Sequence, residues 1–193
     1  MQSRGGYGER VADRAFLVGA YGTAGGVDLV QTSGYELAQI NIGRLRAPLS
    51  APQQQEFVAA LAMINKLAED APGFVWRQQA GFGHLTGAEL LGDDTIIINV
   101  SVWQSYQHLH NFTYRSRHGN YLRRRNKWFI PLTPPTTALW WVQAEQPPST
   151  AQAVARLRYL QRYGPSPRAF TVRRRYDPTG QLEEAVRRPP ALG

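Results

Sequence analysis

The segment Thr95-Ile-Ile-Ile-Asn-Val-Ser-Val-Trp103 decides the fold, because its two sets of alternate positions differ in character. The even positions, from Ile96 to Val102, are all aliphatic, whereas the odd positions include Asn99 as well as Trp103. Successive side chains of a β-strand point to opposite faces of the sheet. The segment therefore predicts a strand with one core face and one mixed face.

Three further strands are expected around this one, at residues 35–43, 74–79 and 138–142, where alternating or aromatic and β-branched residues predominate. Two stretches with apolar residues at helical spacing, 57–68 and 106–129, separate them. The resulting order, β-α-β-β-α-β, is that of a ferredoxin-like antiparallel sheet with both helices on one face. The fold class is therefore α+β.

A third helix and an edge strand are expected after this unit. Ser149 or Thr150 suits the first position of a helix that ends at Gly164. Residues 170–176 are strongly basic and predict a strand at the edge of the sheet.

The chain divides into three segments by composition. Residues 1–33 are rich in glycine and are expected to be disordered, residues 34–176 to form the single α+β domain, and residues 177–193 to form a polar tail. The net charge of +8 is uneven. Residues 1–100 hold 7 Lys or Arg against 10 Asp or Glu, a balance of −3, and residues 101–193 hold 15 against 4, a balance of +11.

Composition excludes several classes of site. The chain has no cysteine, which rules out disulfides and thiolate chemistry. Its apolar runs are far shorter than the roughly 20 residues that cross a bilayer, and the N-terminus lacks an apolar signal region. A soluble, cytoplasmic protein is expected, with no membrane partner.

The mixed face of the sheet predicts a homodimer. If both helices cover the aliphatic face, the opposite face must be covered by something else, and a second copy of the chain is a common solution. The residues on that mixed face are Gln39, Asn41, Asn99, Ser101 and Trp103.

Tyr114, His118, Leu122, Arg125 and Phe129 share one face of the second helix if that helix runs unbroken, although Gly119 is a candidate breaking point. His118 is the candidate catalytic acid or base, because a neutral imidazole exchanges protons near physiological pH. Tyr114 could hold its tautomer or bind an oxyanion, and Arg125 could pair with a carboxylate or enolate. The structural alternative is that Tyr114 and His118 only fix the helix to the sheet.

Five residues are candidates for binding a substrate opposite His118. Trp103, Phe129 and Trp141 would form aromatic walls for a planar hydrophobic or aromatic molecule, and Asn41 and Asn99 would supply polar handles. A small-molecule ligand is therefore the expected partner.

No metal site is expected, because no Asp or Glu lies between Asp94 and Glu145 to complete a set of ligands with the histidines. The cofactor is unknown, and the favoured expectation is that there is none. Haem is the alternative, since it needs only one axial histidine, and His118 or His110 could supply it.

Two arginine runs, 123–125 and 173–175, raise the question of nucleic acid, because several arginines together bind phosphates. No DNA-binding or RNA-binding motif accompanies them. They are interpreted as solvated faces, and nucleic acid is not an expected partner.

The chain resembles a bacterial family called domain of unknown function 3291 over residues 36–172. The motifs that carry the resemblance are Leu37-Ala-Gln-Ile-Asn-Ile-Gly-Arg-Leu-Arg-Ala-Pro48, Phe57-Val-Ala-Ala-Leu61, Pro72-Gly-Phe-Val-Trp-Arg77, Asn99-Val-Ser-Val-Trp103, Tyr114-Arg-Ser-Arg-His118, Arg123-Arg-Arg-Asn-Lys-Trp-Phe129 and Trp140-Trp-Val142.

This resemblance implies the dimeric α/β-barrel superfamily, whose relatives include antibiotic-biosynthesis monooxygenases and haem enzymes. It implies no established activity. The first hypothesis is a small enzyme of the monooxygenase or isomerase type that uses His118 and needs no cofactor. The second is a non-catalytic ligand-binding or scaffold protein that uses the same cavity.

Overall fold

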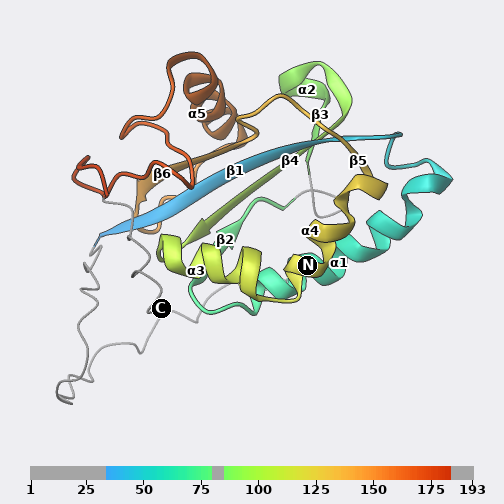
Figure 1. Ribbon diagram of the computed structural model, residues 1–193, viewed down its shortest axis with the longest axis horizontal. Coiled ribbons are helices and arrows are strands. Elements are labelled where there is room, and N and C mark those ends of the chain that lie inside the picture. Colours follow the sequence, from blue (N-terminus) through green and yellow to red (C-terminus); the bar gives the residue numbers. More distant parts are fainter. Residues whose placement is uncertain (1–33, 80–84, 184–193) are drawn as a thin grey trace, which may run out of the picture. The chain divides into compact units, whose positions relative to one another are not determined.

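The computed structural model of the protein describes residues 34–79 and 85–183. They fold into an antiparallel sheet with helices on both faces (Figure 1). All of these residues fall within one compact unit. The strands are β1 (Tyr35–Leu45), β2 (Phe74–Arg77), β3 (Leu85–Gly87), β4 (Asp93–Trp103), β5 (Phe129–Ile130) and β6 (Thr137–Gln143). The helices are α1 (Gln55–Glu69), α2 (Ala88–Leu91), α3 (Tyr106–His110), α4 (His118–Arg124) and α5 (Thr150–Tyr163).

The main strands lie side by side in the order β2-β4-β1-β6, and every neighbouring pair is antiparallel. This is the strand order of a ferredoxin-like sheet, so the predicted β-α-β-β-α-β fold is confirmed. Two short strands are added to it, because β3 pairs with β4 and β5 pairs with the end of β1.

The register of β1 and β4 decides which side chains share a face. Leu37 lies opposite Trp103 and Arg44 lies opposite Ile96, so even positions of both strands point the same way. These even positions form the aliphatic face, and α5 packs on it through Val154 and Leu157. In Figure 1, α5 and α2 lie on one side of the sheet, and α1, α3 and α4 lie on the other.

The mixed face lies under α1, α3 and α4, so the expected assignment of faces is wrong. One apolar cluster joins this face to α1 and α3 and contains Leu37, Trp103 and Leu109. A second cluster, at the other end of β1, joins Leu45 to Phe57 of α1. Alternation along a strand groups the side chains by face, but it does not say which helix covers each group.

A homodimer is no longer required to cover the mixed face, because α1, α3 and α4 of the same chain lie on it (Figure 1). The chain covers the aliphatic face with its own α5, where Ile40 and Val100 are almost fully buried. The homodimer stays a prediction, which sedimentation velocity at micromolar concentration can check.

The expected helix 106–129 is broken. After α3 the chain forms a π-helical turn, Asn111–Arg115, and the backbone becomes extended at Ser116. The Ser116 hydroxyl donates to the Phe112 carbonyl over 2.5 Å and accepts from the backbone N–H of His118 over 3.1 Å. These bonds replace helical ones, so the break falls at Ser116 rather than at Gly119.

After α4 the chain continues through a 3₁₀ turn, Arg125–Lys127, into β5. The expected strand 170–176 pairs with the sheet only at Phe170, which exchanges two backbone hydrogen bonds with Leu139 of β6. Beyond it, Thr171 and Arg174 bond to each other in a turn, which prevents further pairing.

The ends of the chain are only partly described. The expected disordered segment 1–33 and residues 184–193 of the expected tail lie outside the described residues. The part of the tail that is described turns back, and Glu183 forms an ion pair with Arg175. None of the described helices has the length and apolar character needed to cross a membrane.

Replacing Ile98 with alanine should lower the free energy of unfolding by about 2–5 kcal/mol, because Ile98 is buried between β4 and α5 and the change leaves a cavity. Urea denaturation measures this loss. Ile130→Ala is the matched control. Because Ile130 is 41% exposed, this substitution should lower the free energy of unfolding by less than about 1 kcal/mol. Equal losses at the two positions would contradict the described burial.

Candidate functional site

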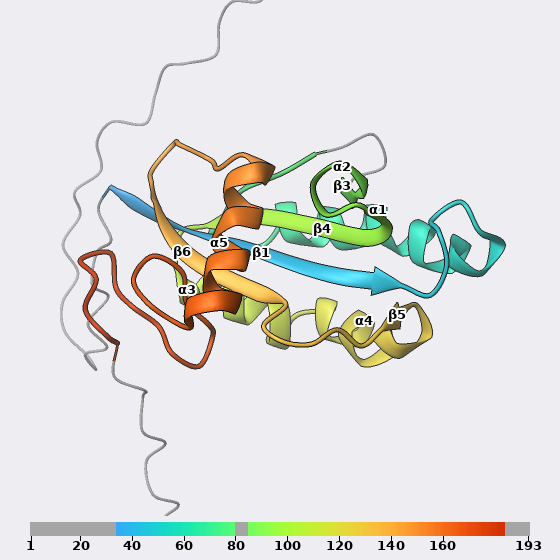
Figure 2. The same ribbon diagram turned by 90° about the horizontal axis from the view of Figure 1, so that it is seen from above.

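Three amide side chains on the mixed face lie between the two apolar clusters, and we call Gln39, Asn41 and Asn99 the amide strip. Asn41 and Asn99 are exposed, although they occupy the two central strands of the sheet. In Figure 2, α1 and the segment from α3 to α4 run on either side of β1. The two apolar clusters occupy the ends of the mixed face, and the two asparagines between them are exposed.

The amide strip keeps hydrogen-bonding capacity for a ligand. The Asn99 Nδ2 donates to Asn41 Oδ1 over 2.9 Å, and Gln39 Nε2 donates to the same oxygen over 3.4 Å. Among the described residues, Asn41 Nδ2 and Asn99 Oδ1 have no hydrogen-bond partner. Asn41 Nδ2 and Asn99 Oδ1 can therefore offer a ligand one hydrogen-bond donor and one acceptor on adjacent strands.

Two aromatic side chains connect this strand to His118. Trp103 is buried, and its Nε1–H donates to the Ser101 hydroxyl over 2.9 Å. The Phe112 ring stacks on Trp103, with the centroids 5.0 Å apart, and the His118 ring lies 4.7 Å from Phe112. The Phe112 ring therefore lies between the rings of Trp103 and His118, on the face of the sheet that α3 and α4 cover (Figure 1).

The break at Ser116 fixes the chemistry of His118. It allows the His118 ring to turn back to the π-helical turn, where Nδ1–H donates to the Thr113 carbonyl over 3.2 Å. A carbonyl only accepts, so Nδ1 carries the proton and the neutral ring has its lone pair on Nε2. No other described residue forms a hydrogen bond with that Nε2.

Burial lowers the pKa of His118 below its ordinary value of 6.5, and the bond to the Thr113 carbonyl opposes the shift. The sequence supplies no carboxylate between Asp94 and Glu145 to stabilise the imidazolium. His118 is therefore neutral at pH 7 and able to accept a proton at Nε2.

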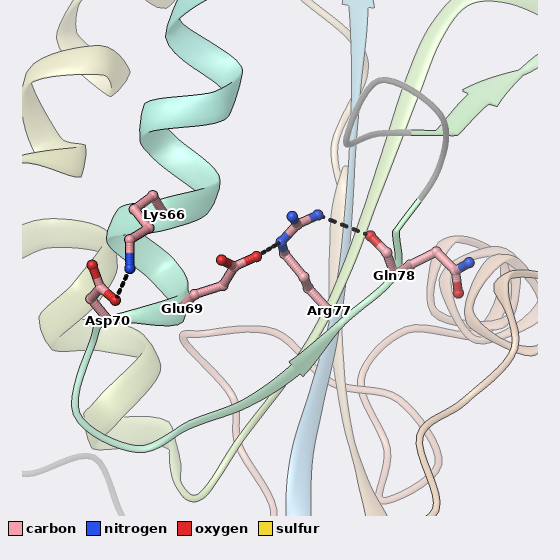
Figure 3. Close-up of polar contacts among 5 residues, drawn as sticks. All are labelled: Lys66, Glu69, Asp70, Arg77 and Gln78. Carbon is pink, nitrogen blue, oxygen red and sulfur yellow. Dashed lines mark hydrogen bonds and ion pairs between the residues drawn. The ribbon is translucent and has the colours of Figure 1, made fainter. Parts of the chain in front are cut away.

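An ion pair borders the mixed face on the side of β2. Arg77 lies opposite Ser101 in the sheet, and its Nε donates to Glu69 at the end of α1 over 2.8 Å (Figure 3). Figure 3 also shows Lys66 and Asp70 paired one turn apart on the same helix. The Arg77 side chain is only 13% exposed, so this ion pair ties the end of α1 to the sheet.

The structure separates the other expected wall residues from the amide strip. Phe129 lies in the second cluster, against Gly43 and Phe57. Trp141 lies in the first cluster, and its Nε1–H donates to the Tyr176 carbonyl over 2.6 Å. Of the five expected binding residues, Asn41 and Asn99 lie directly opposite each other in β1 and β4, and Trp103 and Trp141 meet in the first cluster.

Tyr114 and Arg125 are not brought to His118. Tyr114 is 56% exposed, and its ring contacts His110. Arg125 is exposed in the 3₁₀ turn. The shared face that was expected for these residues required an unbroken helix, and the extended backbone at Ser116 removes it. Their catalytic roles stay predictions.

Phe112, Thr113 and Arg77 belong to the site but were not expected. Thr113 could not be identified from its side chain, because it contributes a backbone carbonyl that the π-helical turn leaves free to accept from His118. Phe112 was recognised only as an apolar helix position. Its place between Trp103 and His118 depends on the packing of α3 against β4.

The described part of the chain contains no group of three or more His, Asp or Glu side chains able to hold a metal ion. The unpartnered Nε2 of His118 could serve as a single axial ligand for haem. Two open grooves, of about 410 and 360 Å³, lie around α5 rather than over the amide strip.

Residues 36–186 match a family described as Domain of unknown function (DUF3291), which confirms the resemblance expected from the sequence. No curated protein matches the chain.

Several solved structures are similar at low identity. SnoaB, a cofactor-independent oxygenase from Streptomyces nogalater, is 14% identical, with a TM-score of 0.40 over 57% of this chain and 94% of that one. Rv0793 from Mycobacterium tuberculosis is 13% identical, with a TM-score of 0.41 over 59% and 99%. A conserved protein from Methanosarcina mazei Go1 is 11% identical, with a TM-score of 0.40 over 58% and 95%. The fold assignment rests on the strand order and register of this chain.

The stability of the protein should depend on pH through His118. Because the folded-state pKa is lowered, the unfolded chain takes up protons first as the pH falls below 6.5. The free energy of unfolding should then fall with pH, by at most about 1.4 kcal/mol per unit, until the folded-state pKa is passed. Urea denaturation of the wild type and of His118→Gln between about pH 5 and 8 measures this slope. A stability difference between the two proteins that does not change with pH would contradict the assignment.

Proposed function

The chain belongs to the DUF3291 family, and from this premise we propose that it binds a planar aromatic small molecule between its sheet and the helices α1, α3 and α4. The observation that carries the proposal is the open pair Asn41–Asn99. The rest of this face is apolar where the helices cover it. A few polar groups on a mainly apolar surface are typical of a ligand-binding site.

The free groups of the amide strip define what such a ligand carries. Asn41 Nδ2 suits a carbonyl or phenolate oxygen, and Asn99 Oδ1 suits a neighbouring hydroxyl. The flanking apolar clusters, which contain Trp103 and Phe57, favour a flat ring system beside these polar atoms. A hydroxylated aromatic ketone or phenol has this combination of groups.

His118 is proposed as the base that deprotonates the bound phenol or an activated carbon acid. Its neutral state and unpartnered Nε2 support this role. The arginines Arg115 and Arg117, which flank it in the sequence, favour the anion that forms. Tyr114 and Arg125 are proposed to take part only if the segment around Ser116 rearranges when substrate binds.

Two reactions follow from this proton transfer. In an isomerisation, His118 returns the proton to another atom of the same substrate. In a cofactor-free oxygenation, an electron-rich anion reduces dioxygen directly: a ring CH₂ and O₂ become a ring C=O and water. Both are within the monooxygenase-like and isomerase-like chemistry expected from the sequence.

Binding can be tested with 1,8-dihydroxyanthrone, which carries a carbonyl between two phenols. Asn99→Ala should weaken its binding about tenfold, the effect of losing a hydrogen bond of about 1.4 kcal/mol. Titration calorimetry measures the affinity. Asn126→Ala is the matched control, because Asn126 is exposed in the 3₁₀ turn and its carbonyl, which accepts from Arg46, is retained. Equal affinities of the two variants would remove the amide strip from the site.

Catalysis can be separated from binding with His118→Ala in an oxygen electrode. Loss of a general base should reduce oxygen uptake by about 10²-fold or more while calorimetric affinity changes little. Binding without turnover in the wild type would favour the non-catalytic alternative. A visible Soret band in the purified protein that is lost in His118→Ala would replace the proposal with haem binding.

A further inference from the structure

The segment from α5 to the end of the last turn is basic without any acidic residue. Residues 150–176 contain no Asp or Glu. Their arginines are Arg156, Arg158, Arg162, Arg168, Arg173, Arg174 and Arg175. The arginines of α5 lie on the aliphatic side of the sheet, away from the amide strip, where α5 faces the viewer in Figure 2. Arg175 instead lies over the ring of Tyr106, which packs against the first cluster on the mixed face.

Arginine and tyrosine share the outer stripe of α5. The stripe consists of two pairs of residues, each pair one helical turn apart: Arg158 with Arg162, and Tyr159 with Tyr163. Residues at this spacing lie on one side of the helix. The buried side is formed by Val154 and its neighbours at helical spacing. Tyr159 is half-buried against the core, whereas Arg158, Arg162 and Tyr163 are exposed and do not fill it.

Tyr159, Arg162 and Tyr163 form a row of ring contacts with Arg168, which we call the stack. The Arg168 guanidinium lies 4.8 Å from the centre of the Tyr159 ring, and the Tyr159 and Tyr163 rings are 4.9 Å apart. The Arg162 guanidinium lies 5.3 Å from the Tyr163 ring. Tyr163 is 64% exposed, so the stack presents aromatic surface and positive charge to the solvent together.

The stack borders an open groove of about 410 Å³, within the range of roughly 300–1,000 Å³ that small ligands occupy. Arg158, Arg162 and Arg168 all line it. The floor is apolar and includes Val154 and Leu90. The groove thus combines an apolar floor, aromatic walls and three guanidinium groups.

The guanidinium groups around this groove have no counter-ion among the residues that the structure describes. In the described ranges, none of Arg158, Arg162 and Arg168 forms an ion pair, whereas Arg44, Arg77, Arg124 and Arg175 each do. On the neighbouring groove, the Arg156 side chain donates to the backbone carbonyl of Arg168 over 2.9 Å. Burial, together with the charge of Arg168, lowers the pKa of Arg156, as expected where like charges meet without an anion.

We propose that this arginine–tyrosine groove binds a small anion that also carries an aromatic ring, of the nucleoside monophosphate class. The base stacks on the exposed face of Tyr163 and the phosphate accepts hydrogen bonds from Arg158, Arg162 and Arg168. The groove is sized for one such unit. This site is separate from the amide strip and does not depend on the proposed function.

The test uses adenosine 5′-monophosphate as the probe, measured by titration calorimetry with the full chain at low salt. Arg162→Ala and Tyr163→Ala should each weaken binding about tenfold or more, because they remove the anion contact and the stacking contact respectively. Both residues are exposed on α5, so circular dichroism should show the fold unchanged. Arg174→Ala, which removes the same charge from an exposed position outside the groove, should change the affinity less than about twofold.

Two truncated probes divide the proposal into its parts. Adenosine and ribose 5-phosphate should each bind at least about tenfold more weakly than the whole nucleotide. If adenosine binds as tightly as the nucleotide, the anion requirement is overturned, and if ribose 5-phosphate does, the aromatic requirement is overturned.

Two further outcomes would overturn the assignment to a small ligand. If Arg174→Ala weakens binding as much as Arg162→Ala does, the nucleotide is attracted by the overall positive charge of the segment and not by a defined site. A single-stranded oligonucleotide that binds far more tightly than the mononucleotide, with affinity falling steeply with salt, would show a nucleic-acid surface instead.

Discussion

The register of β1 against β4 is the constraint on which the rest of the structure depends. Because side chains alternate with a period of two, a shift of one residue would exchange the two faces of β4. Asn99 and Ser101 would then be buried under α5, where unpaired polar groups cost about 1–3 kcal/mol each, and Val100 would be exposed among the amides. The aliphatic face therefore fixes the register, and the register in turn places both asparagines side by side.

Most strands and helices of the fold could be predicted from the sequence, because each depends on a pattern of neighbouring residues. Alternation in 95–103 gives the central strand, and helical spacing with a serine cap gives α5. The break at Ser116 could not be predicted in the same way, since apolar residues keep their helical spacing through it and only the hydroxyl bonds reveal it. For the candidate site, Asn41, Asn99 and Trp103 follow from one face of two paired strands, whereas Phe112 beside His118 depends on tertiary packing that no local pattern contains.

The two faces of the sheet support different chemistry because their helices differ. On the mixed face, α1 and α3 bring apolar side chains to the ends of the sheet, and the middle remains neutral and hydrogen-bonding. Here the one histidine beside Phe112 is kept uncharged by burial. On the aliphatic face, α5 fills the core with one side and concentrates arginine and tyrosine on the other. The proposed neutral polar site and the proposed anion site thus lie on opposite faces of the sheet.

The bridge between Leu139 and Phe170 has a consequence for how this protein meets copies of itself. A bare outer strand offers a row of amide and carbonyl groups to which another chain can add, which is a common route to aggregation. The segment after α5 occupies that position on β6 with two backbone bonds and then turns away, anchored where the Trp141 indole donates to the Tyr176 carbonyl. On the opposite side of the sheet the outer strand, β2, spans only Phe74–Arg77 and is interrupted by a bulge. The sheet is therefore poorly suited to grow sideways, and self-association would have to use its helical surfaces.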